Sequence, residues 1–282
     1  MHPKITHLER VEINNLWGEV DIDWQLHPKV NILIGVNGSG KTTLLDIIES
    51  ISNNDSKPDN YDYDKVKLSF NDNSFVISER CQTPVDNLGK YHVTTVGDVA
   101  AFDIDKISTF DIPQVRTEPA NQKSAEIASG LDILLEQLLD DFKGYQLKNV
   151  KVAEIEHNQL LFELNSLFDC TRKVVEFDNN NGLSFRKNGK TISPYRLSTG
   201  EKQILIILLK VILHEEKPGV LLIDDPELSL HLAWQLKFID MIQWLNENCQ
   251  LIIATHAPGI FNKGWRDKLT KMEHIVIDRS LR

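Results

Sequence analysis

The first third of the chain alternates apolar and polar positions, which is the period of half-buried strands. The alternating segments are 5–13 and 20–24 around a turn at Asn14 and Asn15, 65–70 and 74–78 around a turn at 71–73, 91–96, and 101–112. Residues 30–34 are almost continuously apolar and predict one buried strand, with a helix to follow over 42–51. We therefore predict a mixed, largely antiparallel sheet beside a buried strand.

The middle third has the spacing of helices. Leucines and one phenylalanine recur at intervals of three and four residues from Leu131 to Phe142, which places them on one helix face. Gly144 is expected to interrupt this helix, and a second amphipathic helix is predicted over 160–168. The two helices would form a hairpin within 121–170. Such a hairpin most often packs on its own domain, and a partner-binding arm is the alternative.

The last third combines apolar helices with apolar strands. The expected elements are a strand hairpin at 174–177 and 183–185, a helix at 204–213, a strand at 220–223, a helix at 229–246 and a strand at 251–254. Continuous apolar strands separated by helices predict a parallel sheet that is covered on both faces.

Composition and cysteine usage narrow the class of protein. Apolar residues make up 41% of the 282 residues and charged residues 26%, as in a globular domain, so we expect a single domain over 1–282 with 121–170 inserted in it. No apolar run is long enough to span a bilayer, and no signal peptide is apparent, so we expect a cytoplasmic protein without a membrane partner. The three cysteines form no Cys-x-x-Cys pair, which argues against a zinc site of the usual spacing.

The charge pattern leaves a nucleic-acid partner open. A net charge of −10 means that the molecule as a whole does not attract DNA. Two stretches, 186–202 and 263–271, are nevertheless locally basic. A solvated face is the commoner explanation of each, and a DNA contact is the alternative.

Residues 35–42 match the phosphate-binding P-loop pattern in full. Glycines in such a loop let backbone N–H groups turn toward phosphate oxygens, and the helix that follows adds its dipole. Lys41 is expected to reach the β- and γ-phosphates and Thr42 to ligate Mg²⁺. The candidate nucleotide-binding residues are Gly35, Asn37, Gly38, Ser39, Gly40, Lys41, Thr42 and Thr43.

Acidic residues and a histidine follow the two late buried strands. Asp224 ends the first strand and is placed to hold Mg²⁺, and Asp225 stands where a base that activates water is expected. Glu227 suits the first turn of the helix after it and could assist the base. His256 follows the second strand, within reach of a γ-phosphate. A lone histidine is more often structural.

A turn of small residues opens the helix over 204–213. It contains Ser198, Gly200 and Glu201, and a helix start of this kind is a second anion-binding geometry. We include these three residues among the candidate nucleotide contacts.

These motifs, in this order, resemble the ABC-type ATPase superfamily in its SMC/RecF-like branch, and especially the compact ATPases of Septu-type and retron-linked anti-phage defence systems. The resemblance implies a signature motif at 197–201, a Walker B strand ending at Asp224, a D-loop at 228–231 and a switch histidine at His256. It also implies a Q-loop glutamine, for which Gln114 is the candidate metal ligand. The likeness covers residues 1–52 and about 190–262, and the middle third aligns with nothing.

The fold class that follows is α/β: an ABC-type ATPase head with a P-loop core, a mixed or antiparallel N-terminal sheet and a helical-hairpin insertion. In this family the signature of one subunit closes over the ATP held by another. We therefore expect a homodimer or higher oligomer that acts as an ATP-driven switch in DNA-linked anti-phage defence or repair. The residues after His256 are too few for a nuclease domain, so we expect a separate effector protein, such as a nuclease.

The chain departs from the family at two points. Asp225 stands where the family has glutamate, and a side chain one methylene shorter predicts slow hydrolysis unless the backbone restores its reach. A short helical hairpin replaces the long coiled coils of SMC-like relatives. Two alternatives stay open: a scaffold that binds ATP without hydrolysing it, and the nucleotide-binding subunit of a transporter. Glu201, where transporters usually have glutamine, argues against the second.

Overall fold

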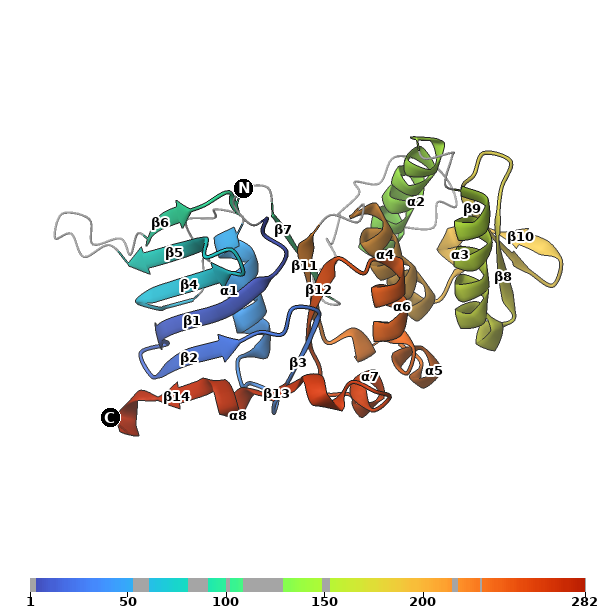
Figure 1. Ribbon diagram of the computed structural model, residues 1–282. Helices are drawn as coiled ribbons and strands as arrows, with labels where there is room; N and C mark the ends of the chain where they lie inside the picture. Colours follow the sequence, from blue (N-terminus) through green and yellow to red (C-terminus); the bar gives the residue numbers. More distant parts are fainter. Residues whose placement is uncertain are drawn as a thin grey trace, which may run out of the picture. The chain divides into compact units, whose positions relative to one another are not determined.

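The computed structural model describes residues 4–52, 61–80, 91–99, 102–108, 129–148, 153–214, 218–228 and 230–281 (Figure 1). The chain divides into two compact units. The first, which we call the P-loop unit, comprises residues 1–108, 216–226 and 248–282, and the second, the signature unit, comprises 109–215 and 227–247. The expectation of one domain over 1–282 with an insertion at 121–170 stays a prediction.

A five-stranded sheet in strand order β13-β3-β12-β11-β7 forms the centre of the P-loop unit. Its strands are β3 (Val30–Ile34), β7 (Asp103–Ser108), β11 (Gly219–Asp224), β12 (Cys249–Ala254) and β13 (Leu269–Lys271). All four pairings are parallel. Every residue of β11 and β12 is buried, which is why these strands have continuous apolar sequences.

A six-stranded antiparallel sheet in the order β14-β2-β1-β4-β5-β6 completes this unit (Figure 1). Its strands are β1 (Leu8–Leu16), β2 (Val20–Gln25), β4 (Lys65–Phe70), β5 (Phe75–Arg80), β6 (Tyr91–Val96) and β14 (Val276–Asp278). Apolar side chains from both sheets and from helix α1 (Lys41–Ser52) form one core cluster. The buried Gln250 side chain joins the sheets, because it donates to the carbonyls of Leu8 and His27 and accepts from the Leu8 N–H.

The signature unit combines helices with a small sheet. Its helices are α2 (Gly130–Lys148), α3 (Ala153–Phe168), α4 (Thr199–Leu213), α5 (Leu232–Gln235) and α6 (Phe238–Leu245). Its strands, in the order β10-β9-β8, are β8 (Lys173–Phe177), β9 (Leu183–Lys187) and β10 (Lys190–Ile192). Helix α2 packs along α4, so the helical hairpin contacts its own unit rather than standing free.

Most predicted strands and helices are present, and the differences have local causes. The turn between β1 and β2 lies at 17–19 rather than at Asn14 and Asn15, because the left-handed conformations that reverse the chain are those of Trp17 (φ 58°) and Gly18 (φ 77°). Asn15 is also left-handed (φ 57°) but lies inside an irregularity of β1. Gly144 does not interrupt α2: the cost of about 1 kcal/mol for glycine in a helix is outweighed by packing on α4.

The predicted helix over 229–246 is wrong as a single helix. Helices α5 and α6 are separated by a turn at Leu236 and Lys237, and His231 caps α5. The short strands β10, β13 and β14 and the short helices α7 (Pro258–Phe261) and α8 (Met272–Ile275) were not predicted. Of the strand expected at 101–112, residues 101 and 109–112 lie outside the described part. Within the described part, no helix has the length and apolarity needed to cross a membrane.

Candidate nucleotide site

The parallel sheet brings three distant motifs to one edge. Its register pairs Asp224 with Ala254, and Ala254 with Leu33, so the carboxyl ends of β11, β12 and β3 lie side by side. The residues that continue from these ends are Asp225, His256 and the loop that begins at Gly35. In open α/β sheets, ligands bind outside the carboxyl ends of the strands.

The loop between β3 and α1 has the backbone that its glycines allow. Gly38 and Gly40 have φ values of 80° and 93°, in the left-handed region that other residues rarely adopt. A side chain at Gly40 would also collide with the Trp17 ring, whose Cη2 atom would lie 2.8 Å from the added Cβ. Helix α1 starts at Lys41, so its N-terminal N–H groups face the loop.

Lys41 and His256 meet, although 215 residues separate them. The Lys41 Nζ atom lies 2.8 Å from His256 Nε2, and it donates to the carbonyls of Gly35 at 3.0 Å and Val36 at 3.3 Å. Because an ammonium group can only donate, the His256 Nε2 atom accepts in this pair. The structure thus places the lysine inside the loop, on partners that phosphate oxygens can replace.

Asp224 is buried, with 1% of its surface exposed. Burial raises the pKa of its carboxyl group, while a hydrogen bond with the Thr42 hydroxyl and the charge of Lys106 oppose the rise. Its Oδ1 atom has no hydrogen-bond partner among the described residues. A carboxylate with an unused oxygen beside a threonine hydroxyl fits Mg²⁺, which prefers oxygen ligands.

Three further residues, Asp46, Tyr61 and Lys106, form a contact network next to Asp224 and were not among the predicted site residues. The nearly buried Lys106 of β7 forms an ion pair with Asp46, which also accepts a hydrogen bond from the Tyr61 hydroxyl. Asp46 stands four residues after Thr42 on α1, one helical turn away. That spacing was the available signal. Lys106 supplies a fixed positive charge close to Asp224.

Asp225 has an unusual backbone. Its φ of 43° lies in the left-handed region, and its N–H donates to the carbonyl of Ala254 at 2.9 Å. Aspartate is enriched among the few non-glycine residues in this region. The shorter residue at the base position therefore suits the local backbone.

Glu227 lies in a 3-10 turn, η4 (Pro226–Leu228), and belongs to the signature unit. It does not sit in the first turn of a long helix, as the sequence suggested, since α5 begins at Leu232. The assignment of catalytic roles to Asp225, His256 and Glu227 stays a prediction.

The signature turn starts α4 with a reciprocal cap. Ser198 is the N-cap and accepts from the Glu201 N–H, while the Glu201 carboxylate accepts from the Ser198 N–H. Ser198 and Thr199 are exposed and Gly200 is half-buried, as a surface for a second molecule requires. Glu201 is fully buried and points into its own unit, so the structure gives it a capping role beside its predicted nucleotide contact.

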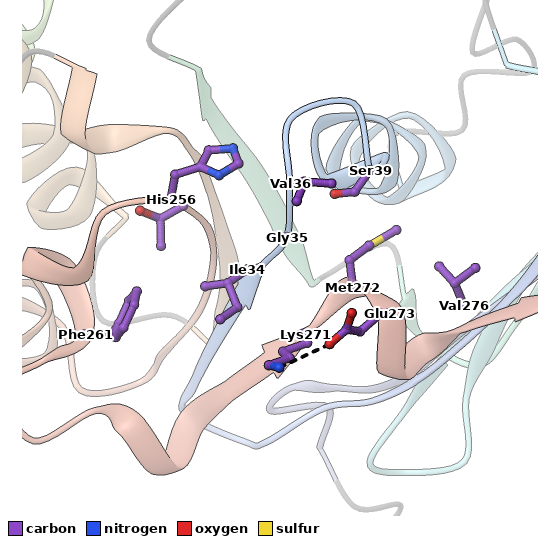
Figure 2. A pocket seen from close by; sticks show the side chains of 11 residues that line it. Ile34, Gly35, Val36, Ser39, His256, Phe261, Lys271, Met272, Glu273 and Val276 are labelled. Carbon is purple, nitrogen blue, oxygen red and sulfur yellow. Dashed lines mark hydrogen bonds and ion pairs between the residues drawn. The ribbon is translucent and has the colours of Figure 1, made fainter.

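Two surfaces beside the P-loop offer space for the rest of a nucleotide. One is the ring of Trp17, which is 41% exposed and was not among the predicted site residues. The other is a cavity of about 570 Å³ on the side of β13 and α8. Figure 2 shows Val36 and Ser39 on its upper side, Phe261 at one end, and Met272 near the loop.

The remaining predictions concern Gln114 and the two basic stretches. Gln114 lies outside the described residues. The basic stretch 186–202 is smaller than its sequence suggests, because Lys202 is buried and paired with Asp132. In the stretch 263–271, three basic side chains contact polar neighbours: Arg266 contacts Asn262, Lys268 contacts Asp267, and Lys271 contacts Glu273.

Comparison with known proteins agrees with this geometry. The family model described as "AAA domain, putative AbiEii toxin, Type IV TA system" matches residues 97–262, and an AAA ATPase domain model matches 7–112. A retron Ec83 probable ATPase from Escherichia coli is 32% identical over 170 residues, which are 55% of this chain and 31% of that protein. The Septu protein PtuA of Bacillus thuringiensis is 22% identical over 89% of this chain and 72% of its own length.

The chain spans less than a third of the length of the first curated relatives that it matches. Among solved structures, an SMC head bound to the C-winged helix domain of ScpA covers 96% of this chain and 97% of its own, with a TM-score of 0.56 and 15% identity. At this identity the likeness concerns the fold alone. It confirms the predicted α/β fold of an ATPase head.

Proposed function

This chain belongs to that AAA-domain family and carries an AAA-type ATPase domain, and on this premise we propose that it is an ATP- and Mg²⁺-dependent switch that pairs two copies head to head. In this proposal, ATP held by the P-loop of one copy is closed over by the signature turn of the other. Hydrolysis is slow and releases the pair. The resemblance to retron and Septu proteins supports a role in anti-phage defence with a separate effector.

One observation carries the ATP-binding part of the proposal. Lys41, Thr42, Asp224 and His256 come from three separate segments, and the folded sheet brings them into two contacting pairs, Lys41 with His256 and Thr42 with Asp224. Together the two pairs supply a cation for phosphate oxygens and oxygen ligands for Mg²⁺ at the end of the glycine loop.

The reaction can be followed through these residues. When phosphates enter the loop, Lys41 Nζ exchanges the carbonyls of Gly35 and Val36 for phosphate oxygens. His256 is thereby released from Lys41, and once its Nε2 atom carries a proton it can donate to the γ-phosphate. Asp225 accepts a proton from the water that attacks the γ-phosphorus, and the bond to the bridging oxygen of ADP breaks. Mg²⁺, held by Thr42 and Asp224, would neutralise charge on the β- and γ-phosphates.

Pairing is supported by the exposure of the signature turn. The P-loop unit contains the phosphate loop and the acidic strand end, whereas the exposed Ser198 and Thr199 belong to the signature unit. A second copy would bring its signature turn to the first copy's ATP and so complete the site.

Sedimentation in the presence of ATP and Mg²⁺ tests this function. We expect a dimer or higher oligomer that dissociates when ATP is omitted, and a Ser198→Arg variant that binds ATP but stays monomeric. Ser193→Arg is the matched control, because Ser193 is another exposed N-cap serine of the same unit. An ATP-dependent species that is unchanged in Ser198→Arg would refute the pairing.

Two further measurements separate the neighbouring hypotheses. A single-turnover hydrolysis assay distinguishes a slow ATPase from a scaffold that binds ATP and never cleaves it. The short Asp225 side chain favours the scaffold if no cleavage is detected. A gene for a nuclease or a reverse transcriptase beside this one would support the defence role. A neighbouring permease gene would support a transporter subunit instead.

A further inference from the structure

The start of α4 is held by two buried ion pairs that come from different elements. The Glu201 carboxylate, which is fully buried, accepts from Lys173 Nζ of β8 at 2.6 and 2.7 Å. The next residue, Lys202, is also buried and pairs with Asp132 near the start of α2. The signature turn is therefore fixed on one side to the small sheet and on the other to the helical hairpin.

Each carboxylate in these pairs has a second task. Asp132 accepts from the N–H and the hydroxyl of Ser129, just as Glu201 accepts from the Ser198 N–H. Burial raises the pKa of each carboxyl group, but the lysine and the capping hydrogen bonds outweigh it and keep both pKa values below their usual range. Both groups are thus ionised at neutral pH, and a rotation of either helix start would break a buried charge pair.

The exposed side of the same turn holds the groups that matter for pairing. The cap uses the N–H groups of Ser198 and Glu201, and the N–H groups of Thr199 and Gly200 are the other two donors in the first turn that have no intrahelical partner. Their direction is set by the first turn of α4. That turn is fixed by Glu201 and Lys202, which lie directly behind them.

Stability alone does not explain these pairs. A buried ion pair is often no more stabilising than well-packed apolar residues, because removing two charges from water offsets their attraction. A pair of this kind does impose one geometry on the elements that it joins. Two such pairs around a five-residue turn indicate that its orientation, and not only its presence, is under constraint.

We propose that Lys173 and Asp132, through Glu201 and Lys202, are positioning residues that aim the signature turn at the ATP of a second copy. The inference rests on the proposed function. It links the helical hairpin to ATP-driven pairing, because α2 supplies one of the two anchors.

The test uses a variant that removes charge but keeps the cap. In Lys173→Met/Glu201→Gln, glutamine can still accept from the Ser198 N–H, as it does in natural capping boxes. We expect an ATP-dependent association constant that falls at least about tenfold, since a tenfold change needs only 1.4 kcal/mol. Asp132→Asn/Lys202→Met, which changes no candidate nucleotide contact, should lower the association constant in the same way and leave the ATP affinity of the dilute, monomeric protein unchanged. The single variant Lys173→Arg, which keeps the positive charge opposite Glu201, should associate as the wild type does. Lys190→Met, an exposed lysine of the same unit, is the control.

The association assay can overturn the positioning role. Equal association in the double variant and the wild type would overturn the positioning role, even if the melting temperature falls. If the double variant does not fold, Asp132→Asn/Lys202→Met removes the other pair as a neutral unit and takes its place in the same assay. If the wild type itself does not associate with ATP, the proposed function fails instead.

Discussion

The buried carboxylates Asp224, in the P-loop unit, and Asp132 and Glu201, in the signature unit, differ in how they are paired. In the P-loop unit, Asp224 keeps an oxygen without a hydrogen-bond partner among the described residues, and burial raises the pKa of its carboxyl group. In the signature unit, Asp132 and Glu201 each accept from a lysine and from a capping group, and their pKa values are lowered. The difference separates a site prepared for a ligand from a frame that is complete without one.

Lysines show the same contrast. Lys41 rests on carbonyls of its own loop and on an imidazole, partners that a phosphate can displace. Lys173 and Lys202 are tied to carboxylates that no incoming group would readily replace. We therefore expect substitutions in the first unit to change ligand binding and chemistry, and substitutions in the second to change assembly.

The largest effect is expected from Lys41→Ala. Its ammonium is the fixed cation of the loop, and hydrogen bonds to charged groups contribute about 1.5–3 kcal/mol each, so ATP affinity should fall at least about a hundredfold. Titration with a fluorescent ATP analogue measures this. The control is Lys268→Ala, which replaces a lysine of the same unit just before β13 and should leave ATP affinity unchanged. Undiminished affinity in Lys41→Ala would remove the P-loop assignment.

Asp225→Asn should leave ATP binding intact and slow single-turnover hydrolysis by about a hundredfold, the lower end of what a general base contributes. Asp225→Glu should bring no gain, because glutamate is less suited than aspartate to the left-handed backbone at φ 43°. Faster hydrolysis in Asp225→Glu would show that reach, not backbone conformation, limits the reaction. Hydrolysis kept in Asp225→Asn and lost in Glu227→Gln would identify the other carboxylate as the base.

Trp17→Ala should weaken ATP binding by about tenfold if the exposed ring stacks on the base, since such stacking contributes roughly 1–3 kcal/mol. Binding of inorganic tripolyphosphate, which has no base, should not change. Phe261→Ala in the neighbouring cavity is the matched variant. If Phe261→Ala weakens ATP binding and Trp17→Ala does not, the base lies in the cavity.

Asp224→Asn should stabilise the nucleotide-free protein at neutral pH. Because the folded state raises the pKa of Asp224, ionisation opposes folding above the unfolded value of 3.8, and a neutral side chain removes that opposition. We expect calorimetry without Mg²⁺ to show a higher melting temperature for this variant than for the wild type. The same variant should lose the stabilisation that Mg²⁺-ATP gives the wild type. A lower melting temperature would show that the carboxylate has a structural partner.

The smallest expected effect is a change in the melting temperature of the protein at acidic pH. The lowered pKa of Glu201 stabilises the fold above its ordinary value of 4.5, and this contribution disappears as the pH falls below that value. The melting temperature of the wild type should therefore drop more steeply below about pH 4.5 than that of Lys173→Met/Glu201→Gln, where the group cannot titrate. Parallel curves for the two proteins would contradict the assignment.

Local sequence was sufficient wherever one physical requirement fixed the residue types. The glycines and lysine of 35–42 predicted the loop, and the continuous apolar runs of β11 and β12 predicted buried parallel strands. Helix α4 begins at Thr199 rather than at the predicted residue 204, and the capping-box spacing of Ser198 and Glu201 was the sequence signal for the earlier start. The sequence also predicted that Asp224 and His256 follow two buried parallel strands, and β11 and β12 are neighbours in the sheet.

Tertiary structure decided what depends on neighbours far along the chain. Nothing in the local sequence shows that Lys106 pairs with Asp46, or that Trp17 lies against Gly40, because each contact joins segments that only the sheets bring together. For the same reason the sequence overstates the basic surface of 186–202 by one lysine, since Asp132 pairs with Lys202 inside the fold. A sequence specifies which side chains can bind phosphate or metal, whereas burial and long-range pairing decide which of them are left open to do so.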